Sequence, residues 1–137
     1  MLTMFWLKSR KKVVLLSTLL VSMGGRMHNR KKNHGLLKYL QTFVVGPWVL
    51  IGDFNAYLQI SEKKSARQLQ FSQIEAFGET LSSCQLQDLG FKGYPYTWSN
   101  KRPGEANTKI RLDRGVANKE WTDRFQLSKI VHLLTHE

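Results

Sequence analysis

The sequence predicts one domain of the mixed α/β (α+β) class, in which helices pack on sheets. The chain has 137 residues, a length that suits one domain and allows it to bury a core. Its apolar residues follow a helical period in some segments and alternate with polar residues in others. A turn-rich cluster at 100–104 separates two strand-like segments, which indicates a β-hairpin.

The first half of the chain is expected to form two strands around one helix. Val and Leu dominate residues 13–21, which is typical of a buried strand. The apolar residues of 36–43 fall on one helical face, so a helix is expected there. Gly46 and Pro47 end this helix. Residues 48–51 are again apolar and predict a short buried strand.

The second half of the chain is expected to form two helices and several strands. In 66–84 the apolar residues recur every three or four positions, which predicts a helix. Residues 86–89 form a short strand. Aromatic residues alternate along 94–98, and 108–116 returns as the second strand of the hairpin. The last two expected elements are a short helix around Trp121 and Phe125 and a strand at 127–133.

The formal charge of the chain is +11, and it is unevenly distributed. Residues 1–52 contain nine Lys and Arg and no acidic residue, so they carry +9. Residues 53–137 contain twelve basic and ten acidic residues and carry +2. A basic surface attracts polyanions, of which nucleic acid is the commonest. The alternative is a solvated basic face that has no partner.

The apolar run that ends at Met23 follows basic residues and loosely resembles a secretory signal. It is too short to span a bilayer, which needs about 20 residues, and a buried strand is the favoured interpretation. The single cysteine, Cys84, excludes an internal disulfide and is expected in the core. We therefore expect a nuclear or cytoplasmic location rather than a secreted one, with no membrane and no disulfide-linked partner. The sequence does not determine the oligomeric state.

An apolar run ends in Gly52-Asp53-Phe54-Asn55. If this segment is extended, Asp53 and Asn55 face one side while Phe54 faces the core. An ionised Asp can accept a proton or orient water, and Asn offers two N–H donors for a phosphate oxygen. Gly52 would allow a backbone conformation barred to other residues. The alternative is a turn in which both polar side chains bond their own backbone.

Three sequence blocks occur in order along the chain: Val-Leu-Ile-Gly-Asp-Phe-Asn at 49–55, Tyr-Pro-Tyr-Thr-Trp-Ser-Asn at 94–100 and Ile-Arg-Leu-Asp-Arg at 110–114. Together they resemble the endonuclease/exonuclease/phosphatase family. The resemblance is greatest to the endonuclease domain of plant LINE-type (non-LTR) retrotransposons. It divides the chain into a basic, poorly matching segment at 1–45, expected to form a strand plus a helix, and a partial family domain at 46–137.

The resemblance implies a DNase I-like fold, a four-layered β-sandwich of two packed sheets with covering helices, of which this chain holds a part. The implied activity is Mg²⁺-dependent cleavage of a phosphodiester, with DNA as the partner. Asp53 corresponds to the catalytic base or water-orienting carboxylate and Asn55 to the residue that stabilises the phosphate. Asp113 corresponds to the Asp that orients a C-terminal histidine. Trp98 is the candidate substrate-binding residue.

The chain departs from the family pattern at two places. No acidic residue precedes Asp53, so the metal-binding Glu of the family has no counterpart, and no residue is assigned as a metal ligand. The Ser-Asp-His block that carries the catalytic histidine is also absent. His132 corresponds to a strand histidine of the plant branch, and His136 does not stand in a Ser-Asp-His context. Mg²⁺ is therefore expected to bind weakly.

Because catalytic groups act as a unit, we expect this polypeptide alone to be a catalytically inactive fragment of an endonuclease domain. Whether it is an enzyme is left open by the sequence. Two alternatives remain: a non-catalytic basic module that binds nucleic acid, or a non-functional retrotransposon remnant. Residues 62–64 are interpreted as a solvated loop.

Overall fold

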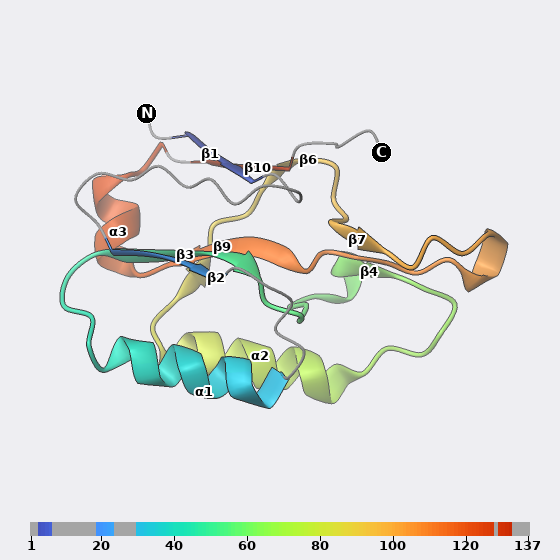
Figure 1. The fold of residues 1–137 in the computed structure, drawn as a ribbon, viewed down its shortest axis with the longest axis horizontal. Helices are drawn as coiled ribbons and strands as arrows, with labels where there is room; N and C mark the ends of the chain where they lie inside the picture. Colours follow the sequence, from blue (N-terminus) through green and yellow to red (C-terminus); the bar gives the residue numbers. More distant parts are fainter. Residues whose placement is uncertain (1–2, 7–18, 24–29, 128, 133–137) are drawn as a thin grey trace.

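The computed structural model describes residues 3–6, 19–23, 30–127 and 129–132, with side chains from residue 34 onward. Figure 1 shows the arrangement of helices and sheets. Of the strand predicted at 13–21, residues 13–18 lie outside the described residues, as does His136, while residues 19–21 belong to a strand. Among the described residues, no helix combines the length and the apolar character that crossing a membrane requires.

The described chain is of the mixed α/β class, as predicted. Its helices are α1 (Arg30–Gln41), α2 (Phe71–Ser83) and α3 (Lys119–Arg124). Its strands are β1 (Thr3–Trp6), β2 (Leu19–Met23), β3 (Trp48–Asp53), β4 (Lys63–Lys64), β5 (Gln87–Asp88), β6 (Lys92–Gly93), β7 (Trp98–Ser99), β8 (Lys109–Ile110), β9 (Asp113–Ala117) and β10 (Lys129–His132). Two short 3₁₀ turns cover Ile60–Glu62 and Gly104–Ala106.

The central sheet has the strand order β2-β3-β9-β5. Its strand β3 pairs in parallel with β2 and antiparallel with β9. Parallel neighbours need a crossover connection, and the segment between β2 and β3 contains α1. Strand β5 pairs antiparallel with the other side of β9.

Two smaller sheets accompany the central sheet. The second sheet has the order β1-β10-β6, and its pairings are parallel. The hairpin sheet, β4-β8-β7, is antiparallel, and its β7–β8 pair forms the predicted hairpin, although residues 94–97 of the expected first strand are not part of a strand. Strand β1 thus pairs with β10, and β2 pairs with β3, so strands from before residue 46 share sheets with strands that follow it.

The central sheet lies between the second sheet and the pair α1 and α2 (Figure 1). On its helical side, Leu50 and Val116 pack with Leu37 and Phe77 of the two helices. On its other side, Val49, Ile51 and Ala117 pack with Ile130 of β10 and with Trp121. Alternating strand side chains thus fill two cores. In the described residues this gives one layer of helices and two of sheets, and the four-layered sandwich remains a prediction.

Close packing of the two sheets depends on a glycine of β9. A Cβ atom at Gly115 would lie 2.6 Å from Cδ1 of Ile130, closer than real carbon contacts allow. The absence of a side chain at this position therefore lets β10 approach the central sheet. Overpacking of such a site forces side chains and backbone to shift.

Helix α3 begins where its sequence provides a cap. The side-chain oxygen of Asn118 accepts a hydrogen bond from the backbone N–H of Trp121, as Asn does at helix N-caps. The same oxygen accepts from the N–H of Trp48, and the Asn118 amide donates to the Gly46 carbonyl. Asn118 therefore joins the start of α3 to the start of β3.

Several predicted boundaries differ from the observed ones. The helix expected from residue 66 begins at Phe71, because Ser65 Oγ accepts the N–H of Arg67 and holds a local turn. Within the strand expected at 108–116, pairing passes from the hairpin sheet to the central sheet after Ile110. At this break, Thr97 Oγ1 accepts the N–H groups of Leu112 and Asp113. Cys84 is buried in the core, as expected.

Candidate functional site

Asp53 ends β3 and Asp113 begins β9, and these two residues are direct register partners. Directly opposed residues of antiparallel strands lie on the same face of the sheet. Ile51 precedes Asp53 by two positions and packs toward the second sheet, so both carboxylates belong to the face between the two sheets. Asp113 is buried and Asp53 is half-buried.

The residues after Asp53 do not continue as an extended strand. Asn55 has φ of 50°, in the left-handed region, and its backbone N–H donates to Asp53 Oδ1 at 2.7 Å. This is a turn closed by an Asp side chain. The predicted alternation is therefore wrong at Asn55, although Phe54 is buried in the core as expected.

Gly52 does not have the role that the sequence indicated. It is a strand residue whose register partners are Met23 of β2 and Arg114 of β9. The left-handed conformation occurs at Asn55, a residue type that tolerates it. The turn closed by Asp53 thus fixes the backbone position of Asn55, two residues after the last residue of β3.

His132 of β10 lies close enough to Asp113 to sense its charge. Its ring stacks on Phe91 at 4.6 Å between centroids, and its Nδ1 lies 2.8 Å from the carbonyl oxygen of Tyr94. Since a carbonyl accepts, Nδ1 carries the hydrogen. Burial lowers the pKa of His132, and Arg111 adds to this, whereas the Tyr94 bond, Asp113 and Asp88 act in the opposite direction. The imidazole is therefore neutral at neutral pH.

The sequence did not predict a buried ionic cluster that lies beside this site. Two arginines, Arg111 and Arg114, pair with two carboxylates, Glu62 and Asp88, at distances of 2.8–3.1 Å. Arg114 is 1% exposed and also donates to the carbonyl oxygens of Ala56 and Arg111. We call these four side chains the ionic cluster.

The interpretation of residues 62–64 as a solvated loop is wrong for Glu62, which is 9% exposed. Its carboxylate accepts from both arginines and from the N–H of Leu58, and its carbonyl accepts the N–H of Arg111. Lys64, by contrast, is exposed. Sequence reasoning missed Glu62 because its partners come from distant parts of the chain; the signal was two arginines flanking Leu112-Asp113 in a buried strand.

The electrostatics of Asp88 reflect this cluster. Burial alone raises the pKa of its carboxyl group, but Arg114 and Arg111 outweigh that effect, and the pKa lies below its ordinary value. Its Oδ1 also accepts the N–H of Gly90 at 2.7 Å. Asp88 is therefore ionised at neutral pH.

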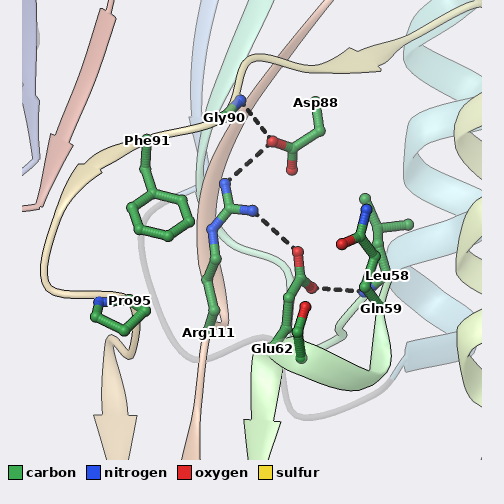
Figure 2. A pocket seen from close by; sticks show the side chains of 9 residues that line it. Leu58, Gln59, Glu62, Asp88, Gly90, Phe91, Pro95 and Arg111 are labelled. Atoms are coloured by element: carbon green, nitrogen blue, oxygen red, sulfur yellow. Dashed lines mark hydrogen bonds and ion pairs between the residues drawn. The ribbon is translucent and has the colours of Figure 1, made fainter.

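A cavity of about 550 Å³ adjoins the ionic cluster. Figure 2 shows the Arg111 guanidinium between the Glu62 and Asp88 carboxylates, with Phe91 beside it. Arg111 lies 4.6 Å from the centre of the Phe91 ring, a cation–π contact. The cavity is lined by Leu58, Gln59, Ser61, Glu62, Asp88, Gly90, Phe91, Pro95 and Arg111. Its charged lining residues are two acidic and one basic, and Arg111 bonds to both carboxylates.

The structure brings Asp53, Asn55 and Asp113 to one end of the central sheet. Trp98 lies elsewhere, half-buried in the hairpin sheet with Ile110 as its register partner. The link between them is Thr97, whose hydroxyl accepts the Asp113 N–H. Trp98 is thus the chain neighbour of a residue that bonds to the Asp113 backbone.

The carboxylate oxygens of Asp53 and Asp113, which we call the Asp pair, are ligands that suit a hard cation. Mg²⁺ prefers oxygen ligands and is commonly held by one or two carboxylates together with water and phosphate oxygens. Asp53 and Asp113 provide two such carboxylates on adjacent strands. The described residues contain no group of three or more His, Cys, Asp and Glu placed to hold a metal ion.

No family model matches the chain, and no curated protein matches it significantly.

Proposed function

We propose that this chain is part of a Mg²⁺-dependent, phosphodiester-cleaving endonuclease domain of the kind found in LINE-type retrotransposons. The sequence resemblance motivates the proposal, and the pairing of Asp53 with Asp113 carries it. Two carboxylates that neighbour each other only through sheet register form an arrangement suited to a metal-assisted hydrolase. The DNase I-like four-layered fold belongs to the same proposal.

In this proposal each residue has a chemical task. The Asp53 carboxylate accepts a proton or orients the attacking water, and the Asn55 amide donates to a phosphate oxygen. Asp113, buried beside Asp53, supplies the second carboxylate. Mg²⁺, when bound, neutralises charge that develops on the phosphate.

A polypeptide of these 137 residues is expected to leave supercoiled plasmid un-nicked in the presence of Mg²⁺. It holds no acidic residue before Asp53 and no Ser-Asp-His block, and catalytic groups of this kind act together. The measurement is conversion of supercoiled to open-circular DNA, with Asp53→Ala as the comparison. Nicking that is robust in the parent chain and lost in Asp53→Ala would overturn the inactivity and support a catalytic role for Asp53.

Metal binding provides a positive test of the Asp pair. Mn²⁺, a paramagnetic substitute for Mg²⁺, is expected to broaden the NMR amide signals of residues 53–55 and 113. The double variant Asp53→Asn/Asp113→Asn should lose this broadening, because it removes both carboxylates while keeping their shape. Glu75→Gln/Glu79→Gln is the matched control, since it removes two exposed carboxylates from α2. Broadening that survives in the Asp double variant would exclude a metal site there.

A second candidate is a non-catalytic module that binds nucleic acid. The observation that favours it is an excess of Lys and Arg over acidic residues in the segments that build the hairpin sheet. Binding through phosphates alone is strongly salt-dependent and independent of sequence. This candidate requires no chemistry at Asp53.

A further inference from the structure

Two lysines face each other across the hairpin sheet. Lys64 of β4 is the register partner of Lys109 of β8, which in turn pairs with Ser99 of β7. Alternation places these three side chains on one face and Lys63, Ile110 and Trp98 on the other. We call the face of Lys64, Lys109 and Ser99 the lysine face. Like charges placed directly opposite destabilise a sheet, so the arrangement is unfavourable until an anion shields it.

The Lys109 ammonium is held in place on this face. Its Nζ donates to the Tyr94 hydroxyl at 3.0 Å and lies 5.7 Å from the centre of the Tyr94 ring. The Tyr94 hydrogen bond raises the pKa of Lys109, so the side chain stays charged. Tyr94 itself is 39% exposed, which leaves part of its ring available beside the ammonium.

The surroundings of the lysine face are also positive. Residues 63–67 and 97–110, which build the sheet and its turn, contain six Lys and Arg and one acidic residue, Glu105. In the part of the chain that the structure describes, neither Lys64 nor Lys109 forms an ion pair. Ser99 contributes a hydroxyl group to the lysine face, and its oxygen accepts the backbone N–H of Lys101.

We propose that the lysine face binds the phosphate backbone of a nucleic acid, with the Tyr94 ring contacting a base or sugar. Two ammonium groups on opposed strands can each bind a phosphate, and the Ser99 hydroxyl and the partly exposed Tyr94 ring beside them suit a nucleic acid. An anionic membrane would need apolar side chains to enter the lipid, and this face consists of two lysines and a serine, with Tyr94 beside Lys109. The inference deepens the proposed function and rests on it for the identity of the polyanion.

The test is fluorescence anisotropy of labelled single-stranded and duplex 20-mers with the full chain at 50 and 200 mM salt. Lys64→Gln/Lys109→Gln is expected to weaken binding about tenfold at the lower salt and to reduce the salt slope by about 2. The matched control, Lys38→Gln/Lys119→Gln, makes the same charge change on exposed positions of α1 and α3 and should change affinity less than about threefold. Lys64→Arg/Lys109→Arg should retain affinity, which separates loss of charge from loss of folding.

Equal losses in the two glutamine variants would overturn the proposal, because net charge alone would then explain binding. Binding of phosphatidylserine vesicles without binding of either 20-mer would overturn it in favour of a membrane. Tyr94→Leu is expected to weaken single-stranded binding more than duplex binding. Plasmid nicking and Mn²⁺ broadening report on the Asp pair separately, so failure of the lysine face is distinguishable from failure of the proposed function.

Discussion

Replacing Arg114 with methionine is expected to lower the free energy of unfolding by about 3–5 kcal/mol, because it leaves Arg111 as the single cation facing the buried Glu62 and the half-buried Asp88. Arg114 is buried and bonds to Glu62 and Asp88 at 2.8 Å. Methionine has similar length and packs well against aromatic rings such as Phe77, so the loss reports on the charge and hydrogen bonds of Arg114 rather than on its volume. The measurement is urea-induced unfolding followed by far-UV circular dichroism.

Two further variants make this result specific. Arg124→Met removes an exposed guanidinium from the last turn of α3 and is expected to cost less than about 1 kcal/mol. Adding Asp88→Asn to Arg114→Met should recover part of the loss, since one carboxylate then faces the one remaining cation, Arg111. If Arg114→Met costs no more than Arg124→Met, the ionic cluster does not stabilise the fold.

Replacing Trp121 with alanine is expected to cost about 3–5 kcal/mol, the range for removing a large buried aromatic side chain. Trp121 is 0% exposed and packs with Val49, Ile51 and Ile130 between the two sheets. The ring also contacts Phe125 at 5.0 Å between centroids. Its loss would open a cavity in the core that holds β10 on the central sheet. Urea unfolding of the variant measures the change.

Trp121→Phe is the matched variant, because it keeps an aromatic ring at the site. The indole Nε1 has no hydrogen-bond partner among the described residues, so phenylalanine sacrifices no such bond and should cost less than about 2 kcal/mol. Phe43→Ala removes an exposed ring and should have an effect within about 0.5 kcal/mol. Similar costs for Trp121→Ala and Phe43→Ala would contradict the position of Trp121 in the core.

Local patterns predicted many of the elements but few of their ends. The apolar run before Asp53 is a buried strand, and the helical periods at 36–43 and 66–84 correspond to α1 and α2. Their boundaries depend on hydrogen bonds that periodicity does not encode, such as the Ser65 turn ahead of α2. The helix expected around residues 121 and 125 is α3, and Asn118 sets its start.

The candidate site shows the same division. Asp53 and Asn55 are candidate site residues in the sequence because these two polar residues follow an apolar run. The strand alternation that predicted their common side does not extend to Asn55. The Asn55 backbone is left-handed and its N–H donates to the Asp53 carboxylate, as in the alternative of a turn. Glu62 gave no such signal, and its role depends on Arg111 and Arg114.

The sequence by itself determined the mixed α/β class, the apolar strand before Asp53, the basic character of residues 1–52 and the lack of an internal disulfide. These are properties of composition and of short-range periodicity, which can be recognised in the sequence without knowledge of long-range contacts. Only the tertiary structure decided that Asp53 opposes Asp113, that Lys64 opposes Lys109 and that Glu62 is buried. The physical reason is that sheet register and charge burial arise from contacts between residues far apart in the chain. The energies of such contacts cannot be inferred from the sequence of one segment.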